Sequence, residues 1–186
     1  MRDIVRRGYR AIETGDIRDV AEHVHDEFVN DEAVHEPPAA REGGPRGFAT
    51  TVAWLRTAYS ELSFVEDDFV QDGDRYVSSV TMYGKHTGPL VVRDGAKYIV
   101  LPPSGRRFTH RQVHLGRVAD GKVIEHRAIR DDLGLMHQLG YAPPTPRAIA
   151  RQLWWAISGR RRAAITAFER LEPATSRLAQ SAALNG

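Results

Sequence analysis

Apolar residues recur every three or four positions in three segments of the N-terminal third of the chain. They do so over residues 4–12, 17–24 and 44–62, and the turn sequence TGD separates the first two segments. This spacing places apolar side chains on one face of a helix, so it predicts three helices. A short strand and a loop are expected between the second and third helices, over EFVNDEAVHEP at 27–37.

From residue 63 onward apolar and polar positions alternate, which is typical of strands. Two strands are predicted within 63–88, and two more within 106–131 around ADGK at 119–122, where Asp–Gly suits a hairpin turn. Helices followed by antiparallel strands predict an α+β domain whose helices cover one face of a curved sheet. A further hairpin is predicted over 90–100, and we expect it at the rim, as a lid or as a dimer contact.

Three prolines in YAPPTP, residues 141–146, interrupt any helix and mark a boundary. We therefore expect a domain over 1–140, and a Pro-rich linker with a basic amphipathic helical tail over 141–186. The tail contains seven arginines and two glutamates. Four of its apolar residues form a stripe at helical spacing: Ile149, Leu153, Trp154 and Ile157. The stripe predicts packing on the domain or on a second subunit, and the alternative is contact with an anionic membrane surface.

Composition narrows the chemistry that the chain can perform. Its 186 residues include no cysteine, which excludes disulfides, thiolate zinc sites and cysteine nucleophiles. The N-terminus lacks the apolar run of a signal peptide, and no stretch of about 18 apolar residues occurs, so we expect a cytoplasmic protein. A formal net charge of +2 and a single arginine cluster give no reason to expect nucleic-acid binding.

Several motifs occur in an order that suggests a family: GPRGF, GKHTG, PPSGRRFTHRQV and ADGKVIEHRAIRDDLGLMHQLG. Together they make residues 1–140 resemble the SnoaL-like polyketide cyclases, also called ester cyclases. The resemblance implies the cone-shaped α+β fold shared with ketosteroid isomerase, nuclear transport factor 2, scytalone dehydratase and limonene epoxide hydrolase. It also implies an aspartate at the end of the last strand, acting as general acid and base on a hydrophobic cyclic substrate without metal or cofactor. By position, that aspartate is Asp131.

Strand alternation places Arg127 and Asp131 on one face. Arg127 stands where the family commonly has Trp, and an Arg within about 4–6 Å lowers the pKa of a carboxyl group by roughly 1–3 units. The pair therefore predicts an ionised Asp131 that Arg127 orients. On the preceding strand His110, Gln112 and His114 share a face, and we expect this face to line the pocket, with His114 as a catalytic hydrogen-bond donor to a substrate carbonyl.

Other residues are candidates for substrate binding rather than chemistry. Trp54, Met82 and Tyr83 are expected in the cone wall, and His35 and His86 near its rim. No metal site is expected, because histidines four positions apart on a strand, as in HRQVH, lie more than about 10 Å apart. The expected partners are a hydrophobic small molecule and a second copy of the chain.

Two alternatives to a cyclase remain. An Asp/Arg pair suits water activation of the epoxide-hydrolase type, although the sequence does not identify a second acidic residue for it. The same fold also serves as a non-catalytic ligand cup or accessory subunit, since one fold hosts many functions.

Overall fold

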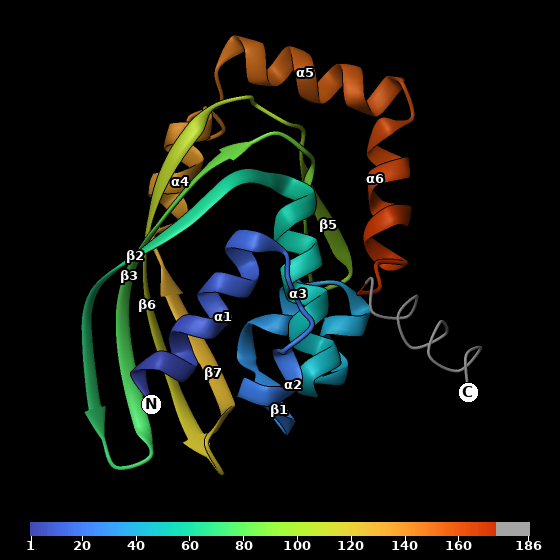
Figure 1. Cartoon of the computed structure of the whole chain (residues 1–186). Coiled ribbons are helices and arrows are strands. Elements are labelled where there is room, and N and C mark those ends of the chain that lie inside the picture. The colour runs from blue at the N-terminus through green and yellow to red at the C-terminus, as the bar shows by residue number, and fades with distance from the viewer. Residues whose placement is uncertain (174–186) are drawn as a thin grey trace.

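The computed structural model describes residues 1–173 (Figure 1). Its N-terminal part comprises α1 (Arg2–Thr14), α2 (Val20–His23), β1 (Val24–Asn30), the 3₁₀-helices η1 (Asp31–His35) and η2 (Pro38–Glu42), and α3 (Gly44–Ala58). The strands that follow are β2 (Tyr59–Asp72), β3 (Arg75–His86), β4 (Leu90–Asp94), β5 (Lys97–Leu101), β6 (Arg107–Ala119) and β7 (Lys122–Arg130). The last helices are α4 (Asp132–Leu139), α5 (Pro146–Ile157) and α6 (Arg160–Glu169).

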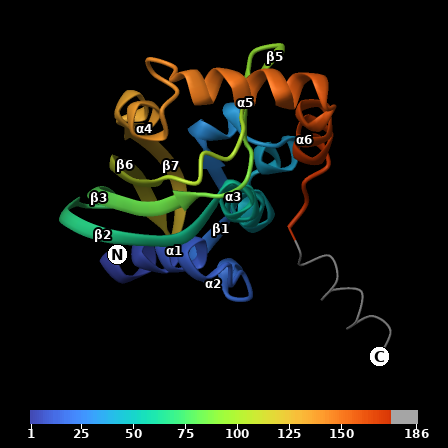
Figure 2. The ribbon, with the colours of Figure 1, turned by 90° about the horizontal axis from the view of Figure 1, so that it is seen from above.

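Five strands form one curved sheet in the order β1-β7-β6-β3-β2. β1 runs parallel to β7, and the other neighbours are antiparallel. The sheet curves around α1 and α3, which cover its concave face, and α4 lies beside the end of β6 (Figures 1 and 2). The predicted α+β fold is confirmed. β4 and β5 form a separate two-stranded sheet, so the predicted hairpin over 90–100 is present.

Two predicted helices are shorter than the periodicity suggested. The segment 17–24 contains only the single turn Val20–His23, because Val24 already pairs with Val123 on β7. The helix expected over 44–62 ends at Ala58, because Tyr59 pairs with His86 as β2 begins. In both cases strand pairing overrides a local helical pattern, as tertiary contacts commonly do.

The β6–β7 hairpin contains an irregularity that decides which side chains face inward. Its turn matches the prediction, with positive φ at Asp120 (50°) and Gly121 (73°). Val118 pairs with Val123, but Arg117 pairs with Glu125, so β7 carries one extra residue, Ile124. Such a β-bulge reverses the face of every later residue relative to a regular hairpin.

We call residues 146–169 the C-terminal arm. α5 crosses above the hairpin of β4 and β5, and α6 descends beside β5 (Figures 1 and 2). The prediction that the α5 stripe packs on the domain is wrong: Leu153 is 63% exposed and Ile157 is 84% exposed. Trp155 and Ala148 are buried instead, on the opposite side of the helix.

Within the described residues, the structure contains no helix with the length and apolar character needed to span a membrane.

Candidate functional site

A cavity of about 540 Å³ lies between the concave face of the sheet and the helices that cover it. Most of its wall is apolar, contributed by Ile4, Val5, Ile12, Val24, Phe28, Phe48, Leu55, Phe64, Leu90, Val92, Leu101 and Leu135. Its polar lining includes His23, Asn30, Glu32, His35, Glu36, Thr51, Asp94, His110, Gln112, His114, His126, Arg130 and Asp132. A concave apolar site with a few convergent polar groups is the usual form of a small-molecule site.

Strand pairing brings the polar groups together on one wall. Inward positions on β6 carry His110, Gln112 and His114, as the sequence predicted. On β7, Ala128 lies opposite His114 and Arg130 lies opposite Gln112, so the even-numbered residues of β7 share this face. The even-numbered residues of β7 that follow the bulge at Ile124 therefore line the cavity.

The predicted placement of Asp131 and Arg127 in the cavity is wrong. Both side chains are exposed, and neither lines the cavity. Asp131 caps α4, where its Oδ1 accepts a hydrogen bond of 2.9 Å from the backbone N–H of Gly134. A Cβ at Gly134 would lie 2.1 Å from Asp131 Oδ2, so the Asp-x-x-Gly spacing of the motif serves this cap. The bulge at Ile124 is the cause, because it turns Asp132 and Arg130 inward in their place.

Three of the other predicted substrate-binding residues line the cavity. Trp54 and Met82 do so, and the Trp54 indole N–H donates a hydrogen bond of 2.9 Å to the carbonyl of Val91 on the hairpin. His35 lies at the rim, with Nδ1 2.9 Å from the carbonyl oxygen of Arg93.

The remaining two do not line it. Tyr83 is 41% exposed, on the opposite face of β3 from the buried Met82, because neighbouring strand residues face opposite ways. His86 is fully buried outside the cavity, where its Nδ1 accepts a hydrogen bond of 3.2 Å from the Ser104 backbone N–H. Burial lowers the pKa of His86 to about 4. It anchors the loop that precedes β6.

Five polar side chains form a continuous series of hydrogen bonds along the cavity wall. We call them the polar chain: His110, Gln112, His114, His126 and Asn30. In that order, the separations between neighbours are 3.0, 2.8, 2.7 and 2.9 Å. The chain runs from β6 across β7 to the end of β1.

One more contact continues the series at its outer end. His110 Nε2 lies 3.3 Å from Asp132 Oδ1, in ion-pair range but outside the geometry of a straight hydrogen bond. The four hydrogen bonds of the polar chain need four hydrogens, which three neutral imidazoles and one side of the Gln112 amide supply. Asn30 Oδ1 supplies none, and it also accepts the backbone N–H of Glu32 at 3.2 Å. Neutral rings make all four bonds when the amide oxygen of Gln112 faces His110, a 180° rotation that exchanges amide atoms of similar size.

Burial and charge distinguish the three rings of the polar chain. Burial lowers the pKa of His126 to about 4 and that of His114 well below its ordinary value, so both rings are neutral at pH 7. Of the three rings, His110 is the one that faces a carboxylate, that of Asp132.

Arg130 lies between two carboxylates at the same end of the cavity. Its guanidinium is 2.7 Å from Glu32 Oε2, and its Nε is 3.6 Å from Asp132 Oδ1. His110 foremost, and then Arg130, hold the pKa of Asp132 below its usual value, so this group is ionised at neutral pH. The Asp132 side chain is 63% exposed whereas Glu32 is 16% exposed, so Asp132 is the carboxylate open to an incoming molecule.

A third carboxyl group, that of Glu36, is buried at the inner end of the polar chain. Its Oε1 accepts a hydrogen bond of 3.3 Å from the Asn30 amide, and its Oε2 accepts one from the Thr51 hydroxyl. Burial raises the pKa of Glu36. Its bonds hold Asn30, and through it the chain, in one orientation.

Among residues 1–173, no group of three or more His, Asp or Glu side chains is arranged to hold a metal ion.

The sequence model of the SnoaL-like polyketide cyclase family matches residues 3–139 of the chain. The chain belongs to this family. It is 40% identical over 145 residues to the aklanonic acid methyl ester cyclase DnrD of Streptomyces peucetius, covering 77% of this chain and 93% of that one. It is 35% identical over 134 residues to the nogalonic acid methyl ester cyclase of Streptomyces nogalater, covering 70% and 90%.

Solved structures agree with the fold. TsrD from Streptomyces laurentii aligns with a TM-score of 0.61 at 27% identity, over 75% of this chain and 93% of that one. IdmH of Streptomyces antibioticus aligns with a TM-score of 0.56 at 24% identity, over 74% of this chain and 96% of that one. The family match ends before the C-terminal arm begins.

Proposed function

We propose that the protein closes a ring in the methyl ester of a polyketide acid, with Asp132 as the general base and then the general acid. One observation carries the proposal: an ionised carboxylate, paired with His110 and Arg130, lies at the open side of an apolar cavity. The names of the related enzymes, which are cyclases of two such methyl esters, support the substrate class.

The chemistry requires one proton to leave a carbon and one to reach an oxygen. Asp132 removes a proton from a carbon flanked by carbonyl groups, and the electrons of that C–H bond delocalise as an enolate. The enolate carbon then bonds to a ketone carbon of the same molecule, and protonated Asp132 returns the proton to the resulting alkoxide. Both ion-pair contacts fall on Oδ1 of Asp132, which leaves Oδ2 to carry the proton. A positioned acid–base group contributes roughly 10²–10⁴-fold to such a reaction.

The charges of the wall favour an ester over a free acid. Arg130 is already paired with Glu32 and Asp132. These two carboxylates offset the positive charge of its guanidinium, which would therefore attract a substrate carboxylate only weakly. Asp94 is a further acidic residue of the cavity lining. Bringing a charged acid beside these groups costs Coulomb energy that a neutral methyl ester avoids.

The test is direct turnover. Purified protein is mixed with aklanonic or nogalonic acid methyl ester, and an isomer of unchanged mass with one more ring is followed by chromatography and mass spectrometry. We expect acceleration over buffer for at least one ester, and none for the corresponding free acid. Rates equal to buffer with both esters would contradict the proposal.

The epoxide-hydrolase alternative is not favoured. Glu32 does supply the second acidic residue that the sequence left unidentified, since Arg130 contacts both Glu32 and Asp132. The related proteins of known activity are nevertheless ester cyclases, at 34–40% identity.

We further propose that the protein is a homodimer formed through the convex face of the sheet. Val77 is paired with Leu115, and Val113 with Ile129, so these four residues form one apolar patch on that face. Ile129 is 65% exposed and Val77 is 39% exposed. In sedimentation velocity, Ile129→Asp should convert a dimer into a monomer, and Val34→Asp, at an exposed position on η1, should not. A wild-type monomer at micromolar concentration would reject the dimer.

A further inference from the structure

The hairpin of β4 and β5 forms a wall of the cavity, although it is not part of the main sheet. Its inward side chains, Leu90, Val92, Ile99 and Leu101, line the cavity. A two-stranded hairpin alone is at best marginally stable in water, so something else must hold this wall in place.

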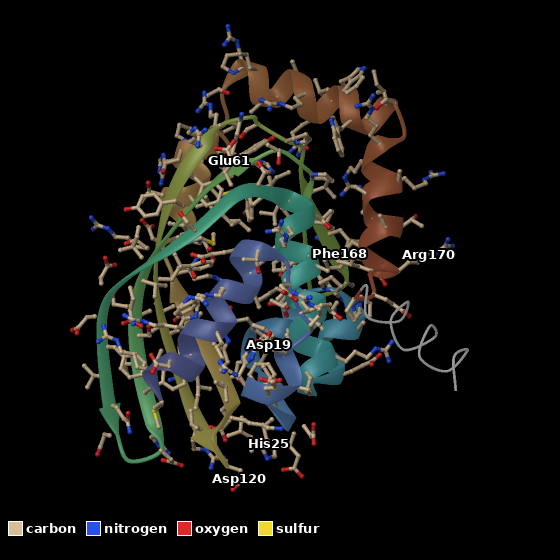
Figure 3. All side chains as sticks on the ribbon, viewed as in Figure 1. Asp19, His25, Glu61, Asp120, Phe168 and Arg170 are labelled. Atoms are coloured by element: carbon tan, nitrogen blue, oxygen red, sulfur yellow. The ribbon has the colours of Figure 1, made fainter. Side chains whose placement is uncertain are left out.

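The outward face of the hairpin packs on the C-terminal arm. Val91 and Val100 point away from the cavity and form a separate apolar cluster with Trp155, Ala164 and Phe168. All five are at most 9% exposed. Figure 3 shows Phe168 on the side of α6 that faces the domain, whereas Arg170 points outward. The hairpin is therefore enclosed between the cavity and the arm.

The two edges of the hairpin are held by different parts of the chain. On the β4 edge, the carbonyls of Val91 and Arg93 are bonded by Trp54 and His35, which belong to the domain.

On the β5 edge, the carbonyls are bonded by the arm. Gln152 donates to Val100 O at 3.1 Å, and Arg161 donates to Tyr98 O at 3.1 Å. The Tyr98 hydroxyl also donates to Glu169. Unpaired edge carbonyls need such partners, and on β5 these come from α5 and α6.

We propose that the C-terminal arm is the specificity element of the enzyme: it fixes the hairpin as a rigid apolar wall against which an apolar cyclic ligand packs. This role rests on the proposed function for the identity of the substrate, but not for the existence of the wall. The arm lies beyond the residues that the family model matches, so it adds to the family's common fold.

Hydrogen exchange of the full-length protein tests the mechanical part. Trp155→Ala removes the centre of the outer cluster, and Gln152→Ala with Arg161→Ala removes the bonds to the β5 edge. We expect amides of residues 90–101 to exchange at least tenfold faster in both variants, with no change in β6. Leu153→Ala, on the exposed side of the same helix, is the matched control and should leave exchange unchanged. Equal protection of the hairpin in all variants would overturn the proposal.

Ligand binding tests the specificity part without any turnover. The probe is 1,4-dihydroxyanthraquinone, a neutral fused-ring compound, titrated by its visible absorbance. We expect its Kd to rise at least tenfold in Trp155→Ala and in the double variant, but not in Leu153→Ala. Faster hairpin exchange with unchanged Kd would show a structural brace only and would reject the role in specificity. Because the probe is not a substrate, this result is independent of whether the protein cyclises an ester.

Discussion

Replacing Asp132 with Asn is expected to lower turnover of the methyl ester by roughly 10²–10⁴-fold while leaving its binding nearly unchanged. Asn has the shape of Asp but cannot take up the proton of a C–H bond. The loss should therefore appear in kcat rather than in KM, measured by steady-state kinetics on the ester that the wild-type protein turns over. Circular dichroism and thermal unfolding should show a folded variant, since Asp132 is largely exposed.

The adjacent aspartate provides the matched control. Asp131→Asn makes the same change one residue away, at the cap of α4, where Asn serves almost as well as Asp. We expect its kcat to stay within a few-fold of the wild-type value. If Asp131→Asn abolished turnover and Asp132→Asn did not, the assignment made from the β-bulge would be wrong. The acid–base group would then be Asp131, as the family resemblance implied.

The single-residue error at this strand end has an identifiable physical origin. Alternation alone predicted correctly that His110, Gln112 and His114 share a face, because side-chain alternation is a local property of a strand. Which residues of β7 join them depends on pairing, and a regular two-residue turn at Asp120 and Gly121 would have brought in the odd-numbered ones. The extra residue at Ile124 selects the even-numbered ones.

The sequence did contain a signal of the bulge. Gly116 stands inside β6, and a Cβ there would lie 2.3 Å from the carbonyl oxygen of Glu125. A glycine in the middle of a strand often marks a bulge or a close backbone approach. His126, Asn30 and Glu32 could not be found in this way, because their place in the site depends on a parallel pairing between β1 and β7, which joins residues about 96 positions apart.

The buried histidines predict a second large effect, a loss of stability in mild acid. His86 and His126 have pKa values of about 4 in the folded protein, against about 6.5 in an unfolded chain. Between these values the unfolded state binds more protons, so the free energy of unfolding falls as pH falls from about 6.5 to 4. For the fully buried His86, the shift corresponds to about 3 kcal/mol over this range.

Other buried groups change the size of this effect but not its direction. His114 has a pKa lowered by burial and adds to the loss. Glu36 acts oppositely, because its raised pKa lets the folded state hold a proton that the unfolded state releases. His23 is also buried with a lowered pKa, so four histidines against one carboxyl group leave a net loss in acid. With a typical total stability of about 5–15 kcal/mol, the protein should be close to unfolding near pH 4.

Urea denaturation at half-unit steps from pH 7.5 to 4 measures this slope. His126→Gln keeps a polar side chain at this place in the polar chain but removes one titrating ring. The slope of its free energy of unfolding against pH should therefore be smaller by up to about 1.4 kcal/mol per pH unit. His137→Gln, at an exposed position on α4, should keep the wild-type slope. A wild-type stability that does not change between pH 6.5 and 4 would mean that the inner histidines are not held neutral. The arrangement of neutral rings along the polar chain would then be wrong, whereas Asp132 would keep Arg130 as its charged partner.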